Sequence, residues 1–222
     1  MRMPITKVVA YCGAAIATVA AATTLTLGST MALFSATQTS PSSSFTSGTV
    51  SVGLGATSTT CSVTAMTPGD SSTNYGSGSA SLTPCDYKVK YTGSVAAYLA
   101  VDISVTAGST ALYTATGSGL QLKVGVNGGA TVMSGTTYKN TAGTDTTLVA
   151  GTPVTNILLS TTPASTDDAS TFNIDYLLPL LAPNSLQGGT ASITLTFHAV
   201  QAANQSVGSC TAGQQCSTIV WS

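Results

Sequence analysis

The chain has 222 residues, and only 6% of them are charged, against roughly one quarter in an ordinary globular protein. Because 43% of the residues are apolar, this composition excludes an intrinsically disordered chain, which combines low hydrophobicity with high charge. Glu is absent and Lys and Arg are scarce, whereas Val, Thr and Tyr are common. The first group favours helices and the second favours strands, so the composition predicts an all-β domain.

The N-terminus has the organisation of an export signal. Arg2 and Lys7 form a basic region, and an apolar run from Val8 to Leu27 follows it. Thr30 and Ala32 then stand in a small-residue segment, spaced like an A-x-A cleavage site. We therefore interpret residues 1–32 as a signal peptide that forms a hydrophobic helix. The competing interpretation is a retained membrane anchor, because the apolar run is about as long as a spanning helix of ~20 residues.

Removal of this segment leaves a weakly charged chain. Four lysines then face seven aspartates, which gives a net charge of −3. No basic stripe remains, so the sequence argues against a nucleic acid partner. A surface with so few charges resists self-association poorly, which suits a protein that assembles.

An N-terminal arm, Leu33–Ser44, follows the cleavage site. Leu33 and Phe34 are two apolar anchors, and a Ser/Thr-rich spacer with Pro41 separates them from Phe45. Cleavage after Ala32 would free a new N-terminus. We expect this arm to add itself as a strand to another copy of the chain, because a strand at a sheet edge gains main-chain hydrogen bonds.

Apolar residues alternate with polar ones along most of the remaining chain. This alternation predicts strands over 45–54, 85–91, 99–105, 120–126, 172–176 and 193–197, with shorter candidates at 146–149, 154–159 and 218–221. Residues 55–78 are turn-rich, and the apolar segment 177–183 contains two prolines, so we expect both to be irregular. Residues 45–222 are thus predicted to form one domain, a two-sheet antiparallel sandwich of jelly-roll type.

Four cysteines remain after the signal segment: Cys61, Cys85, Cys210 and Cys216. An even number in an exported chain predicts two disulfides, for which three connectivities exist. The nearer partners would close turn-rich loops, which favours Cys61–Cys85 and Cys210–Cys216. A crossed pairing such as Cys61–Cys210 stays open.

The residues for a catalytic centre are few. His198 is the single histidine, and the chain has neither an H-E-x-x-H motif nor a G-x-S-x-G elbow. His198 alternates with apolar residues of its predicted strand, so we expect an exposed strand residue. Asp167, Asp168 and Asp175 could offer oxygen ligands to a cation, but their spacing matches no known loop and a solvated turn is the better interpretation. The sequence predicts no enzyme, no metal and no cofactor.

Several segments, in order along the chain, carry a resemblance. They are A-LFSAT leading to FTSGTVSVGL (32–54), MTPGDS (66–71), YTGSVAA (91–97), NSLQGG (184–189) and FHAVQ (197–201). Together they resemble the TasA/camelysin family. The chain departs from that pattern in Ala36, where the family often has Asp, in Thr92, where Asn is usual, and in its cysteines.

The resemblance implies an exported jelly-roll protein, processed by an endoplasmic-reticulum-type signal peptidase. It implies self-assembly into fibres of a biofilm matrix or cell surface, in which the arm of one copy completes the sheet of the next. The alternatives are a surface-anchored adhesin or carbohydrate-binding module with the hydrophobic helix retained, a camelysin-like protease, and a pilin that keeps its N-terminal helix. Only the uncleaved signal segment would contact a membrane.

N-terminal sequencing of the native protein tests this interpretation of the export segment. We expect the mature chain to begin at Leu33. A native N-terminus before Gly28 would instead show a retained helix and support an anchored module or a pilin.

Overall fold

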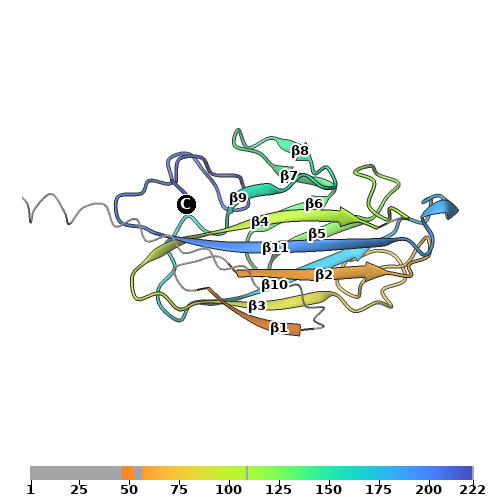
Figure 1. Ribbon diagram of the computed structural model, residues 1–222, viewed down its shortest axis with the longest axis horizontal. Helices are drawn as coiled ribbons and strands as arrows, with labels where there is room; N and C mark the ends of the chain where they lie inside the picture. Colours follow the sequence, from red (N-terminus) through yellow and green to blue (C-terminus); the bar gives the residue numbers. More distant parts are fainter. Residues whose placement is uncertain (1–46, 53–56, 109, 222) are drawn as a thin grey trace, which may run out of the picture. The chain divides into compact units, whose positions relative to one another are not determined.

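Two packed β-sheets make up the computed structural model, which describes residues 47–52, 57–108 and 110–221 (Figure 1). The four-stranded sheet has the order β2-β11-β4-β9. Its strands are β2 (Thr57–Thr64), β11 (Thr190–Gln201), β4 (Ala97–Ala107) and β9 (Val154–Leu158). A short 3₁₀ helix, η1 (Asn184–Leu186), precedes β11.

The seven-stranded sheet has the order β1-β3-β10-β5-β6-β7-β8. Its strands are β1 (Ser47–Val52), β3 (Cys85–Tyr91), β10 (Ala169–Leu177), β5 (Gln121–Val126), β6 (Thr131–Gly135), β7 (Thr137–Lys139) and β8 (Asp145–Thr147). Without β1, β7 and β8, each sheet has four strands. Consecutive strands then alternate between the sheets except β5 and β6, which are neighbours in one sheet, and this is the jelly-roll order. The predicted all-β sandwich is confirmed.

One strand pair departs from the predicted antiparallel arrangement. β1 runs parallel to β3, from the pair Ser47 and Asp86 to the pair Val52 and Tyr91. The other strand pairs of the described residues are antiparallel. Alternation fixes which residues face the core but carries no information on the direction of a neighbouring strand.

The core lies between the sheets and is built from the alternate residues that the sequence pattern indicated. Phe172 of β10 contacts Phe197 of β11 edge to face, with ring centroids 5.0 Å apart, and both side chains are buried. Buried tyrosines keep their hydroxyl groups satisfied: Tyr87 donates to the Thr60 carbonyl at 2.9 Å and Tyr113 to the Leu148 carbonyl at 2.9 Å. The first of these bonds joins β3 to β2 across the two sheets.

Strands β2, β6 and β7 were not predicted, and one predicted strand is absent. The turn-rich segment 55–78 contains the eight-residue strand β2, whose Thr59, Cys61 and Val63 are buried on one face. Ser and Thr occupy positions on both faces of β2, so its sequence lacks a clear alternation of apolar and polar residues. Residues 218–221 form no strand; instead Ile219 packs in a small second core with Cys210 and Cys216.

Two disulfides join Cys61 to Cys85 and Cys210 to Cys216, the pairing that loop closure favoured. The first connects β2 of one sheet with the start of β3 in the other, with 5.9 Å between the Cα atoms. The second closes a short loop in the C-terminal segment, with a Cα separation of 5.6 Å. Each disulfide lowers the conformational entropy of the unfolded chain, and this loss grows with the logarithm of the number of residues in the loop that it closes.

Paired alanine substitutions test this difference. The Cys61–Cys85 loop spans 24 residues and the Cys210–Cys216 loop only 6. We expect Cys61→Ala with Cys85→Ala to lower the free energy of unfolding by about 3 kcal/mol, and Cys210→Ala with Cys216→Ala by about 2 kcal/mol. Urea unfolding measures both variants against the native chain. An equal or larger loss in the second pair would contradict the loop-closure account.

Candidate functional site

The two sheets end differently on their two sides. On one side the outermost strands are β1 and β2, which we call the β1–β2 side; on the other they are β8 and β9. An edge strand exposes a row of unpaired backbone groups that another chain can pair with, so proteins ordinarily cover such edges or place Lys or Pro on them. How each side is protected therefore indicates where a further strand could add.

The C-terminal segment covers β9 and reaches the opposite sheet. The backbone N–H of Leu158 donates to the Gln214 carbonyl at 2.9 Å, and that of Cys216 donates to the Asn156 carbonyl at 2.9 Å. The N–H of Gln215 donates to the Lys139 carbonyl of β7 at 3.0 Å. The Cys210–Cys216 disulfide holds this segment in its turn. The edge strand β9 is therefore paired, and the segment bridges the two sheets on this side.

The β1–β2 side has no such protection in its sequence. Neither β1 (SGTVSV) nor β2 (TSTTCSVT) contains a charged residue or a proline. β1 is fixed at its C-terminal end, where Val52 is 1% exposed and its carbonyl accepts a hydrogen bond from the Thr92 N–H at 2.8 Å. Among the described strands β1 is thus the outermost of its sheet, and its sequence has no charged residue or proline to discourage strand addition.

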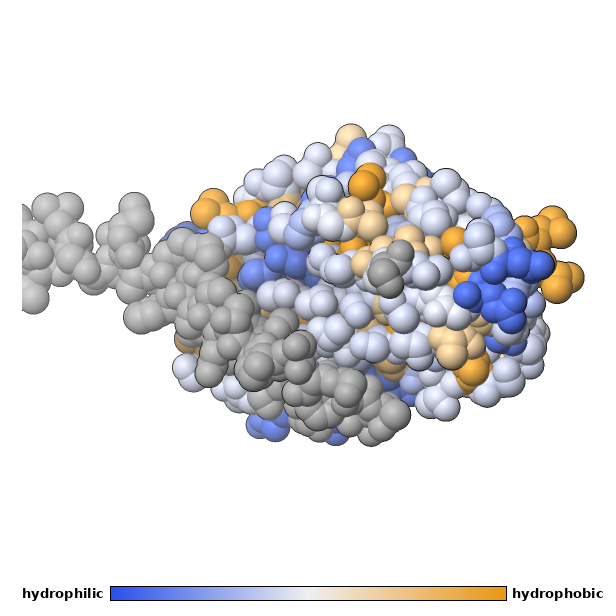
Figure 2. Space-filling view, turned by 45° about the vertical axis from the view of Figure 1, so that its right-hand side comes forward, coloured by the Kyte–Doolittle hydropathy of each residue, from blue (hydrophilic) through white to orange (hydrophobic). Residues whose placement is uncertain are grey.

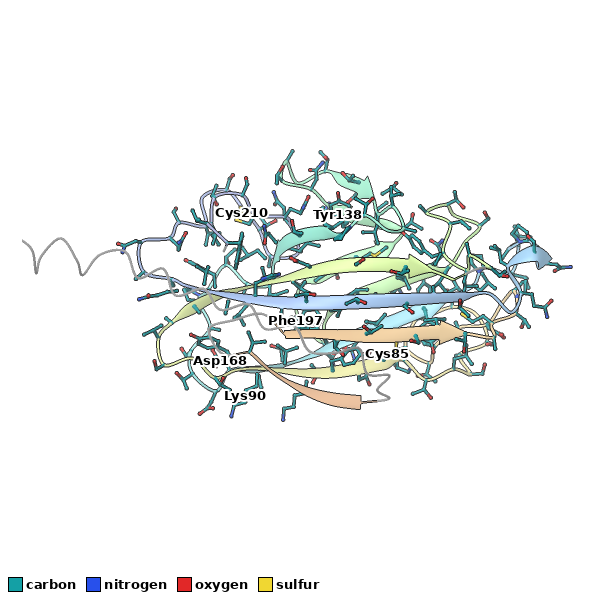
Figure 3. The ribbon with its side chains drawn as sticks, in the orientation of Figure 1. Cys85, Lys90, Tyr138, Asp168, Phe197 and Cys210 are labelled. Atoms are coloured by element: carbon teal, nitrogen blue, oxygen red, sulfur yellow. A yellow bond between two sulfur atoms is a disulfide. The ribbon has the colours of Figure 1, made fainter. Side chains whose placement is uncertain are left out.

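Charged side chains lie on β3, the strand next to the outer strand β1. Lys90 of β3 forms an ion pair with Asp167 at 2.6 Å, and Lys90 and Asp168 lie at the same end of the sandwich (Figure 3). The two side chains of the ion pair are 38% and 70% exposed, so solvent screens the interaction and it contributes little stability. It ties the 160–168 loop to β3.

The sequence-predicted processing and arm residues, Thr30, Ala32, Leu33, Phe34 and Phe45, lie outside the described residues. Their roles stay predictions. The strand predicted to begin at Phe45 is described from Ser47 onward as β1.

His198 is half-buried in β11 rather than an exposed strand residue. Its Nε2 lies 2.7 Å from Oδ2 of Asp102 on β4, and Oδ1 of Asp102 accepts the backbone N–H of Asn156 at 2.8 Å. The pair therefore links three neighbouring strands of the four-stranded sheet. A histidine held by one carboxylate is not by itself a metal site, which needs three protein ligands in catalytic zinc centres.

The three aspartates considered as cation ligands are not brought together. Asp167 pairs with Lys90, and Asp168 accepts the Ser165 N–H at 2.6 Å. Asp175 lies on β10, buried, and accepts the Ser72 hydroxyl at 2.9 Å. Burial raises the pKa of Asp175, the Ser72 hydrogen bond opposes that rise, and the nearby Asp86 carboxylate adds to it. Asp175 is thus a buried strand residue and not part of a solvated turn.

Within the ranges that the structure describes, no three His, Cys, Asp or Glu side chains lie close enough to hold a metal ion. None of the helical segments in the same ranges has the length and hydropathy of a membrane span.

Sequence reasoning missed one exposed feature at the end of β10. The segment 177–183 was expected to be an irregular packed stretch, and it is irregular. Leu178 and Ala182 are indeed buried, but Leu180 and Leu181 between them are 77% and 92% exposed. Composition could not reveal this, because the exposed and buried leucines are adjacent in one apolar run.

The family model described as camelysin metallo-endopeptidase matches residues 7–77, roughly a third of the chain. These residues include the 32–54 stretch, β1, β2 and the MTPGDS segment, so the match confirms the resemblance to the TasA/camelysin family. No curated protein and no solved structure matches the chain significantly.

Proposed function

We propose that this chain is a secreted structural protein that assembles into extracellular or cell-surface fibres by donating its N-terminal arm. In this proposal the arm Leu33–Ser44 of one copy adds as a strand at the β1–β2 side of the next. The observation that carries it is the asymmetry of the two sides: the C-terminal segment closes the β9 side, whereas β1 is an uncharged outer strand.

The energetics of strand addition suit this edge. A donated strand gains main-chain hydrogen bonds with β1, and its alternate side chains pack against the receiving surface. Leu33 and Phe34 are the apolar anchors of the arm, and burial of one such side chain stabilises by about 1.5–3 kcal/mol. Pro41 ends the donated strand before the domain begins.

The direction of assembly follows from the use of two different surfaces. The donating arm and the receiving edge are distinct parts of each copy, so the interface is heterologous and does not close on itself. A repeated contact of this kind generates a filament. The partner in this proposal is a second copy of the chain, and an endoplasmic-reticulum-type signal peptidase frees the arm during export.

Deletion of residues 33–44 tests the donation. We expect the shortened chain to fold but to form no fibres, because the donor strand is missing, whereas the native chain assembles in electron micrographs. A chain with the same segment replaced by an equally long Gly/Ser sequence controls for length and should also fail. Fibres that form at the native rate without the arm would rule the proposal out.

A peptide with the sequence of residues 33–44 extends this test. Added in excess, it should occupy the receiving edge and shorten the fibres. A matched peptide with Leu33→Asp and Phe34→Asp lacks the two anchors and should leave fibre length unchanged. Equal effects of the two peptides would contradict recognition by these side chains.

We propose further that the chain is not a peptidase, although the description of the matching family names one. The support is the donor set of the described residues, where His198 has one carboxylate partner and no further metal ligand. We expect the purified protein to leave casein intact, with or without a chelator. Chelator-sensitive cleavage that disappears in His198→Ala would establish the opposite.

A further inference from the structure

We infer that Leu180 and Leu181 of one copy dock into an apolar cavity at the opposite end of a second copy. This knob, as we call the two leucines, would form a second head-to-tail contact beside the donated strand. The inference deepens the proposed fibre function and rests on it for the open direction of assembly. The contact itself is argued from four separate observations.

The first observation is the position of the leucines in a tight turn. The backbone N–H of Ala182 donates to the Pro179 carbonyl at 2.9 Å, which places Leu180 and Leu181 at the two central positions of the turn. Polar residues and glycine ordinarily occupy such positions. Two leucines that are 77% and 92% exposed there are not explained by the fold.

The second observation is that the fold holds the turn in place. Leu178 before it and Ala182 after it are buried, and the Leu178 carbonyl accepts the Gly69 N–H at 2.8 Å. Gly69 has a φ of +99°, and a Cβ there would lie 3.3 Å from Cδ1 of Leu180. The turn is therefore presented preformed, and docking would cost little conformational entropy.

The third observation is a cavity of about 530 Å³ that opens to solvent where β10 begins. Its size falls within the range of small-ligand pockets. Its apolar walls come from both sheets and the loop before β10: Val89, Leu99, Val126, Leu159, Pro163 and Phe172. Val89 and Phe172 are buried core residues, so the cavity leads directly into the hydrophobic core.

The fourth observation is the placement of knob and cavity at opposite ends of one strand. The cavity is lined by Ala169, Ser170 and Phe172 at the start of β10, and the knob follows its last residue, Leu177. Nine strand residues separate the two by roughly 30 Å. Apolar side chains project from one end of the sandwich in Figure 2.

This placement decides the occupant in favour of a second copy. The knob and the cavity lie near opposite ends of β10, so a head-to-tail arrangement of two copies can bring the knob of one to the cavity of the other. An exposed apolar knob that fits a pocket elsewhere on the same molecule makes a heterologous contact that does not close.

The test compares matched double variants of the full chain as the host processes it. Leu180→Ser with Leu181→Ser removes the knob. Val149→Ser with Val220→Ser removes two other apolar side chains, 56% and 60% exposed, and serves as the control. Sedimentation over a concentration series measures self-association, and electron microscopy measures fibre length. We expect the knob variant to need at least about a hundredfold more protein for half-maximal association, because two leucines stay in water; the control should match the native chain.

A mixing experiment tests the two-surface geometry. Ala212→Trp places a large side chain at the exposed rim of the cavity and should block it. In a chain that also lacks residues 33–44, the knob variant and the Ala212→Trp variant should each stay monomeric. Mixed together they retain one intact knob and one intact cavity, and should form dimers and nothing larger.

The outcomes separate this inference from the arm proposal. Association of the knob variant at the native concentration, or an equal loss in the Val149 and Val220 control, overturns the docking. If deletion of residues 33–44 leaves fibres intact while the knob variant loses them, strand donation fails and the docking stands. If the mixed variants stay monomeric, the second copy is not the occupant of the cavity.

Discussion

The packing of β10 against β11 is the interaction on which the rest of this structure depends. Phe172 and Phe197 meet edge to face between the sheets, with their centroids 5.0 Å apart, and join the two strands that lie inside their respective sheets. A fully buried aromatic pair contributes its transferred area and about 0.5–1.5 kcal/mol more from ring geometry. Because so few charges are available, burial of this kind carries most of the stability.

Because β10 and β11 lie in different sheets, the connection between them also determines which residues are exposed at one end of the sandwich. The connection from β10 to β11 must leave one sheet and enter the other, and it turns outward at Pro179–Ala182. It also brings distant family-like segments together, since the Gly188 N–H donates to the Met66 carbonyl at 3.2 Å. The chain has to cross from one sheet to the other at this end of the sandwich. Leu180 and Leu181 lie in the connection that makes this crossing.

The surface carries few charged residues that would oppose contacts at the edge strand β1 or at the exposed leucines. In an ordinary domain, lysines and glutamates keep edges and apolar tips apart in solution. Here the described ion pairs, Lys90 with Asp167 and Lys139 with Asp145, are exposed and contribute little. Strand β9 is held by backbone pairing and by a segment with a disulfide, whereas β1 and β2 carry no charged residue or proline.

The sequence by itself determined the sandwich and most of its strands. Period-two alternation is a local property, and in β3, β4, β5, β10 and β11 one face is consistently apolar. The spacing of the cysteines favoured the observed disulfides for a similar reason, since short loops close at the least entropic cost. The strand β2 was missed because Thr59 and Cys61 bury a face that reads as polar.

Only the tertiary structure decided the direction of β1, the closed β9 side and the exposure of Leu180 and Leu181. Each depends on which distant segment lies alongside: β3 beside β1, Gln214 beside Leu158, and Gly69 beside Leu180. Asp175 and His198 were misjudged for the same reason, because their burial is set by Ser72 and Asp102 on other strands. A one-dimensional pattern records what a residue prefers to face, whereas the fold determines what it meets.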